Sequence, residues 1–120
     1  KQLKPVLPQV SPAKEELVDR IANLLLGFEK AFDARYPALY SKSRPLQGAE
    51  AGNVSFHLYA IGELKTYSQR TLELYYRQIA GIDPMDEERN PSFVIHRTTT
   101  AFYGYASLDD AEARIRNERQ

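Results

Sequence analysis

The stretch Ser11-Pro-Ala-Lys-Glu-Glu-Leu-Val-Asp-Arg-Ile-Ala-Asn-Leu-Leu-Leu-Gly-Phe-Glu-Lys-Ala-Phe-Asp-Ala-Arg-Tyr-Pro37 decides the fold class. Ser11 can cap free backbone amides, Pro12 suits the first helical position, and Pro37 prevents continuation past Tyr36. At 100° per residue the apolar side chains share one face, namely Leu17, Val18, Ile21, Leu24, Leu25, Phe28, Ala31 and Phe32. The stretch therefore predicts one long amphipathic helix, with Leu26 pointing away from its apolar face.

A second long helix is expected from about Val54 to Ala80, ended by Gly81 and Pro84. Its apolar side chains form two stripes about 100° apart. The first stripe holds Phe56, Ala60, Leu64, Tyr67, Leu74 and Tyr75, and the second holds Leu58, Ile61, Leu72, Tyr76 and Ile79. So wide an apolar arc has to be covered on two sides. Other interpretations stay open: a strand over 54–61, a break at Gly62, or a fresh helix near Tyr67 capped from 66–68.

The remaining segments carry weaker signals. The connector 37–53 is long enough to hold a helical turn. Residues 93–105 follow a helix-start signal, Asn90-Pro91, yet they are β-branched and aromatic, which favours a strand. Neither a period of 2 nor one of 3.6 fits 93–105, and we favour a helix. Ser107-Leu-Asp-Asp110 resembles a capping box and predicts a helix to about Asn117.

Together these patterns predict a mainly α single-domain bundle of three or four helices, two of them long. The fold becomes α+β if 93–105 is a strand. Residues 1–10 are expected to be an extended lead-in, and 11–120 the helical domain. The chain starts at Lys1 and ends within a charged helical pattern. A domain within a longer polypeptide and a processed complete protein both fit.

The composition excludes several function classes. The 120 residues carry 16 basic and 16 acidic side chains, so the net charge is zero, which argues against a polycation that coats nucleic acid. Without cysteine there is no disulfide, thiol nucleophile or Cys-ligated zinc. No apolar run approaches the roughly 20 residues of a membrane span. With no signal peptide in the sequence, a cytoplasmic location is expected.

No catalytic or metal-binding motif is present. His57 and His96 match no ligand spacing, and the acidic segment 83–88 lacks the alternating carboxylates of a calcium loop. There is no nucleophile elbow, and residues 48–52 lack the Lys-Ser/Thr of a phosphate loop. The sequence therefore predicts no enzyme activity, no metal and no cofactor.

Binding to a protein is the function that the sequence favours. Eight tyrosines and no tryptophan are present, and Tyr67, Tyr75 and Tyr76 lie on the wide apolar arc. They predict either a tyrosine-lined docking surface or the edge of the core. We expect a non-catalytic protein–protein interaction or assembly module that self-associates or docks to a larger polypeptide. The predicted partner-binding residues are the second stripe, Leu58, Ile61, Leu72, Tyr76 and Ile79, with Leu26 as an addition.

Nucleic-acid binding is the alternative hypothesis. Its candidate residues are Arg97, Thr98, Arg114, Arg116 and Arg119, which would supply phosphate contacts. The segment Tyr67-Ser-Gln-Arg-Thr-Leu-Glu-Leu-Tyr-Tyr76 resembles the S-x-x-T-l-x-x-Y helix start in the core-binding domain of tyrosine recombinases. That resemblance implies a helical, DNA-gripping module. It covers only this segment, and the recombinase catalytic half is absent.

Overall fold

The computed structural model describes residues 11–43 and 53–118, which form six helices and no strand. The helices are α1 (Pro12–Arg35), α2 (Pro37–Ser43), α3 (Asn53–Leu64), α4 (Gln69–Ile79), α5 (Pro91–Phe102) and α6 (Leu108–Glu118). The predicted mainly α class is confirmed. The predicted lead-in, residues 1–10, lies outside the described residues. None of the described helices is both long and apolar enough to cross a bilayer.

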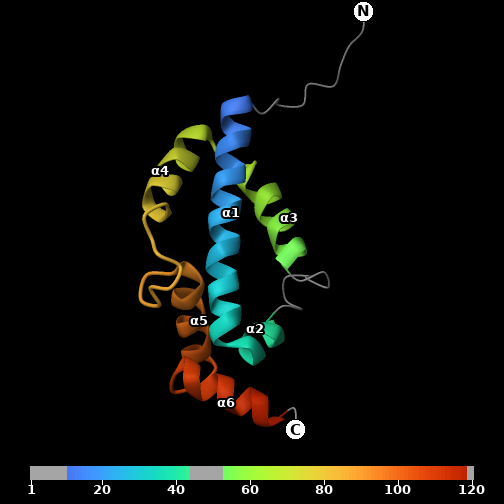
Figure 1. Ribbon diagram of the computed structural model, residues 1–120, viewed down its shortest axis with the longest axis vertical. Coiled ribbons are helices and arrows are strands. Elements are labelled where there is room, and N and C mark those ends of the chain that lie inside the picture. The colour runs from blue at the N-terminus through green and yellow to red at the C-terminus, as the bar shows by residue number, and fades with distance from the viewer. Residues whose placement is uncertain (1–10, 44–52, 119–120) are drawn as a thin grey trace, which may run out of the picture.

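Helix α1 forms as the sequence predicts and is the axis of the fold (Figure 1). The Ser11 hydroxyl accepts a hydrogen bond from the Lys14 N–H at 3.1 Å, and Pro12 occupies the first turn. At the other end the Tyr36 N–H donates to the Phe32 carbonyl before Pro37 starts a new helix. All residues of the predicted apolar face are buried or half-buried. Leu26, which was expected to point away from that face, is half-buried.

The predicted continuous helix over 54–80 is wrong. Helix α3 runs through Gly62 and ends at Leu64, where successive short-range bonds tighten the backbone. The Ser68 hydroxyl then accepts from the Thr71 N–H at 3.1 Å and caps α4. The alternative of a fresh helix capped from 66–68 is the correct one. A new helix has first-turn amides without intrahelical acceptors, and the Ser68 hydroxyl accepts from one of them.

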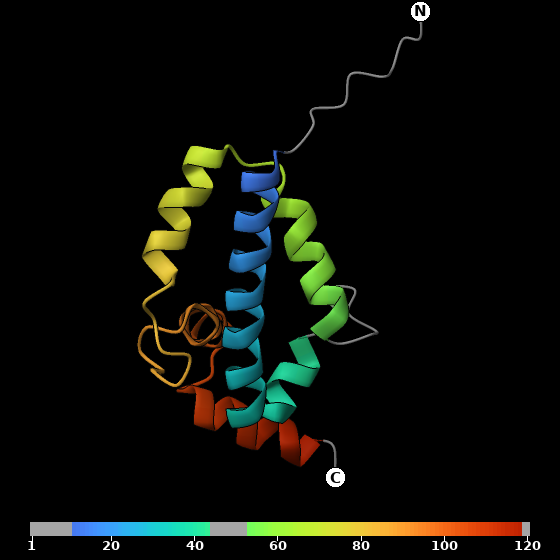
Figure 2. The same ribbon diagram turned by 45° about the horizontal axis from the view of Figure 1, so that its top comes forward.

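The predicted helix count and the second long helix are also corrected. Among the described helices only α1, with 24 residues, is longer than 12 residues. Helices α3 and α4 lie on opposite sides of α1 in both views (Figures 1 and 2). Each turns one apolar face to α1, which explains the wide apolar arc of 54–80. The resulting N-terminal cluster holds Val18, Ile21, Ala22, Phe28, Leu64, Leu72 and Ile79.

A second core covers the other end of α1, where α2, α5 and α6 meet. This C-terminal cluster holds Phe32, Tyr36, Ala38, Leu39, Tyr40, Phe93, Leu108, Ala111 and Ile115. Phe32 is at its centre, with the Phe93 ring 5.0 Å away in an edge-on contact and the His96 ring stacked at 4.0 Å. The apolar face of α1 thus serves two consecutive cores.

A buried carboxylate joins α6 to α2. The Glu112 carboxylate accepts hydrogen bonds from the backbone N–H groups of Ala38 at 3.1 Å and Leu39 at 2.8 Å. These amides belong to the first turn of α2, which has no intrahelical acceptor for them. Arg116 donates to the same carboxylate at 2.7 Å. Glu112, more than 70 positions away in the sequence, therefore acts as the N-cap of α2.

Asn90 fixes α5 against the C-terminal half of α1. Its side chain is fully buried, and its Oδ1 accepts from the Ser92 N–H at 2.8 Å. Its Nδ2 donates to the carbonyls of Phe28 at 3.2 Å and Pro84 at 2.8 Å. The predicted helix start at Asn90-Pro91 is confirmed, and residues 91–102 are a helix rather than a strand.

The end of α5 is set by Gly104. Its φ of 92° is in the left-handed region, which glycine adopts without steric cost. The N–H groups of Gly104 and Tyr105 donate back to the carbonyls of Ala101 and Thr100, as in a Schellman motif. The chain then turns sharply, and Phe102 and Tyr103 remain on the surface.

Helix α6 starts at the predicted capping box. The Ser107 hydroxyl accepts from the Asp110 N–H at 3.0 Å, while the Asp110 carboxylate accepts from the N–H of Ala106 rather than Ser107. The Ala106 hydrogen bond and the Arg114 guanidinium lower the pKa of Asp110. The stabilisation is thus present above the ordinary carboxyl pKa of about 4 and is lost as the pH falls through the lowered value.

Replacement of Asn90 tests its role in joining α5 to α1. We expect Asn90→Ala to lower the free energy of unfolding by about 2–4 kcal/mol, because it removes a cap and leaves buried groups unpaired. The matched control is Ser68→Ala, which removes an exposed cap and should cost only about 1 kcal/mol. Urea unfolding followed by circular dichroism measures both. Equal losses for the two variants would contradict the role assigned to the buried asparagine.

Candidate binding cleft and exposed helix face

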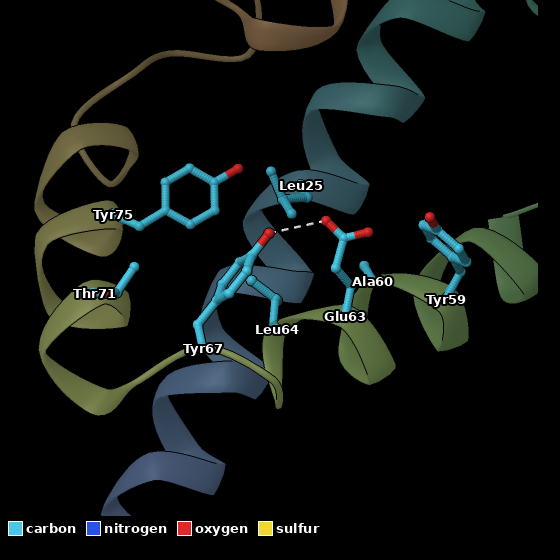
Figure 3. Close-up of a pocket in the computed structure, with 8 residues that line it drawn as sticks. All are labelled: Leu25, Tyr59, Ala60, Glu63, Leu64, Tyr67, Thr71 and Tyr75. Carbon is cyan, nitrogen blue, oxygen red and sulfur yellow. Dashed lines mark hydrogen bonds between the residues drawn. The ribbon is translucent and has the colours of Figure 1, made fainter.

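A tyrosine-lined cleft opens between α3 and α4, with α1 as its floor. Its volume is about 420 Å³, within the range of ligand pockets. The described lining residues are Leu25, Tyr59, Ala60, Glu63, Leu64, Tyr67, Thr71 and Tyr75. Figure 3 shows Tyr75 of α4 extending towards Leu25 of α1, while Tyr67 and Tyr59 lie on either side of Glu63. The break at 65–68 creates this cleft, because it separates the two helices that form its walls.

Glu63 controls the electrostatics of the cleft. The Tyr67 hydroxyl donates to its Oε1 at 3.0 Å (Figure 3). Interaction with this carboxylate raises the pKa of Tyr67 and of Tyr59, since it stabilises each neutral phenol and opposes a second negative charge. Burial is the main cause that raises the pKa of Tyr75. The three hydroxyls therefore stay protonated at neutral pH.

The predicted tyrosine surface is assembled only in part. Tyr67 and Tyr75 line the cleft, and Tyr59 joins them from α3. Tyr76 lies elsewhere, in a shallow depression with Glu16 and Arg20 of α1. The predicted grouping assumed one straight helix, and the break at 65–68 changes which side chains share a surface.

The second stripe does not form a single surface. Leu72 and Ile79 are buried in the N-terminal cluster against α1, so they are core residues and are not accessible to a partner. Ile61 and Tyr76 are half-buried and pack against the same cluster. Leu58 is 64% exposed on α3. The helical wheel could not distinguish residues that pack against α1 from residues that would contact a partner, because both roles need the same apolar pattern.

The described arginines of the nucleic-acid hypothesis are engaged within the chain. Arg97 donates to the backbone carbonyls of Glu87 and Glu88. Arg114 pairs with Asp110 at 3.0 Å, and Arg116 with Glu112. Thr98 donates its hydroxyl to a carbonyl of its own helix, and Arg119 lies outside the described residues. Each of the three described arginines thus has a partner within the chain.

One buried hydroxyl–carboxylate pair lies between α1 and α5. The Ser92 hydroxyl donates to Glu29, which is buried on α1. His96 Nδ1 lies 2.7 Å from the Ser92 backbone carbonyl rather than from its hydroxyl. This geometry is not that of a nucleophile aligned with an imidazole base. Among residues 11–43 and 53–118, no group of three or more His, Cys, Asp or Glu side chains could hold a metal ion.

An exposed apolar face on α5 was not predicted from the sequence. Ser92, Phe93, His96 and Thr100 turn towards α1 and α6, whereas Val94, Ile95, Thr98 and Phe102 share the opposite side. The first set is buried or half-buried and the second set is exposed. With apolar residues on both sides, the helix has no clear 3.6-residue period. The loss of this period after the clear helix start at Asn90-Pro91 was the sequence signal for a helix with apolar residues on two sides.

Removal of the Glu63 charge tests the electrostatics of the cleft. In Glu63→Gln we expect the pKa values of Tyr67 and Tyr59 to fall towards the ordinary value of about 10, because the carboxylate no longer opposes ionisation. The pKa of Tyr75, raised mainly by burial, should change least and is an internal control. Titration of the tyrosine ring carbons by NMR measures all three. An unchanged Tyr67 would contradict the assignment.

Comparisons with known proteins bear on the family alone. No curated protein and no solved structure matches the chain significantly. The model of one family, described as "Protein of unknown function (DUF4125)", matches residues 1–113. The match spans nearly the whole sequence, from before α1 into α6. The chain therefore belongs to the DUF4125 family.

Proposed function

We propose that the chain is a non-catalytic assembly module that pairs with a second copy of itself through the exposed face of α5. The observation that carries this proposal is one exposed face of α5, on which the apolar residues Val94, Ile95 and Phe102 surround Thr98 and which Tyr103 extends beyond the helix end. Ile95 is 62% exposed, Phe102 84% and Tyr103 70%. Contiguous exposed apolar surface of this kind is typical of interaction sites.

The threonine hydroxyls on this side of α5 already have acceptors. The Thr98 hydroxyl donates to the Val94 carbonyl at 3.2 Å, and the Thr99 hydroxyl donates to the Ile95 carbonyl at 2.9 Å. The two threonine hydroxyls thus need no partner from outside, and a surface that covers them leaves neither donor without an acceptor. The face carries no charged residue, so two copies can meet without repulsion or loss of ion hydration.

The order of side-chain sizes favours an antiparallel pair. The β-branched residues Val94 and Ile95 lie in the N-terminal half of α5, and the aromatic residues Phe102 and Tyr103 lie at its end. A two-fold axis at Thr98 would bring Val94 of each copy against Phe102 of the other. Large side chains then meet small ones, as in well-packed interfaces, and the central threonines permit close approach of the helices.

The size of the face indicates a weak, concentration-dependent dimer. An aromatic side chain buries about 150–250 Å², so Phe102 and Tyr103 at their observed exposures offer on the order of 300 Å². Stable interfaces bury about 800 Å² from each partner. The α5 face approaches that value only if Val94, Ile95, Thr98 and the surface around them are also buried in the interface.

The alternative, nucleic-acid binding, stays a prediction. No specific observation favours it, since each described arginine that it requires has a partner within the chain.

The oligomeric state of the 120-residue chain tests the proposal. Sedimentation equilibrium over a range of concentrations should show a reversible shift from 13.7 kDa to twice that mass. Phe102→Glu and Ile95→Glu should each keep the chain monomeric, because the interface would then bury a charge without a partner. Circular dichroism verifies that both variants are folded, as expected for exposed positions.

Leu58→Glu is the matched control. Leu58 is as exposed as Ile95 but lies on α3, in the second stripe predicted from the sequence. We expect this variant to dimerise like the unmodified chain. A monomer at every concentration, or a dimer lost in Leu58→Glu and kept in Phe102→Glu, would reject the α5 face.

A further inference from the structure

The tyrosine-lined cleft holds one unbalanced negative charge. Glu63 is the only charged residue among the described side chains that line it. Within residues 11–43 and 53–118 its carboxylate forms no ion pair with a lysine or arginine. The Tyr67 hydroxyl donates to it at 3.0 Å, and a hydrogen bond to the same carboxylate raises the pKa of Tyr59. The Tyr67 hydrogen bond fixes the orientation of the carboxylate, and Tyr59 lies on its other side (Figure 3).

Aromatic rings surround this charge from three directions. Tyr59 comes from α3, Tyr67 from the turn after it, and Tyr75 from α4 (Figure 3). The faces of an aromatic ring are negative, so they attract cations, and the attraction increases where water is partly excluded. Tyr75 is half-buried, whereas Glu63, Tyr67 and Tyr59 are exposed, so the cleft excludes water on its α4 side and is open on its α3 side.

We propose that this cleft binds an alkylammonium group, with the cation between the tyrosine rings and beside the Glu63 carboxylate. The ring faces contact the alkyl part, Leu25 and Leu64 form an apolar floor, and the carboxylate balances the positive charge. This site is separate from the α5 face, and neither proposal depends on the other.

Other ligand classes fit the cleft less well. The carboxylate and the ring faces both repel an anion. A neutral apolar ligand would cover the carboxylate without replacing its hydration, which costs free energy. A guanidinium binds a carboxylate best through both oxygens at once, and the Tyr67 hydroxyl already donates to one oxygen of Glu63.

Choline and 3,3-dimethylbutanol form a matched pair of probes, because they have nearly the same shape and only choline is charged. We expect choline to shift the NMR signals of the Tyr59, Tyr67 and Tyr75 rings with millimolar affinity, and dimethylbutanol to bind at least about tenfold more weakly. Equal binding of the two probes would overturn the proposal.

Two variants separate charge from shape. Glu63→Gln should weaken choline binding about tenfold or more, since it removes the charge and keeps a hydrogen-bond acceptor. Glu73→Gln makes the same change on α4 outside the cleft lining and should leave the affinity unchanged. Equal affinities of Glu63→Gln and the unmodified chain would also overturn the proposal.

Two further probes distinguish the sources of the ammonium group. Acetyl-lysine-methylamide and its ε-trimethylated form present the group as a protein side chain, whereas choline and tetramethylammonium present it as a free molecule. Tighter binding of the lysine derivatives would identify a protein segment as the source. Tighter binding of the free cations would identify a small metabolite. If none of the four binds, the cleft is not an ammonium site.

Discussion

The fold depends on burial of the apolar face of α1. That face runs along a 24-residue helix, and no other described helix is long enough to cover it. Two groups of short helices therefore share it, α3 and α4 at one end and α2, α5 and α6 at the other (Figure 1). Each buried Leu, Ile or Phe contributes about 1.5–3 kcal/mol relative to exposure, so this division determines where every other helix lies.

Buried polar contacts fix the position of the short helices along α1. Apolar contacts alone are non-directional and would tolerate sliding. Asn90 bonds to the Phe28 carbonyl on α1, and Glu112 bonds to the first amides of α2. Each contact joins residues more than 60 positions apart, and each would leave unpaired buried groups if the helices shifted. The buried amide and carboxylate thus make the arrangement specific.

The same division produces two separate surfaces. The tyrosine-lined cleft lies where α3 and α4 meet α1, and the apolar face of α5 belongs to the other group of helices. Because the two share no residue, the proposed self-association leaves the cleft free. A dimer would then carry two ammonium sites, an arrangement suited to joining partners that present several such groups.

The sequence by itself determined the mainly helical class, the bounds of α1 and the starts of α5 and α6. These features depend on local chemistry: Ser11, Asn90 and Ser107 cap the amides of the next turn, and Pro12 and Pro91 fit the first turn of a helix. Such signals act over about four residues, so they can be identified without knowing which other helices pack nearby.

Only the tertiary structure decided which apolar residues are core and which are surface. Leu72 and Phe102 are both large apolar residues on helices, yet one covers α1 and the other faces solvent. Likewise the break at 65–68 brought Tyr59, Tyr67 and Tyr75 around Glu63 and moved Tyr76 away from them. The hydrophobic effect favours burial against any apolar surface. A one-dimensional pattern therefore indicates that a side chain is more stable when buried, but not which element buries it.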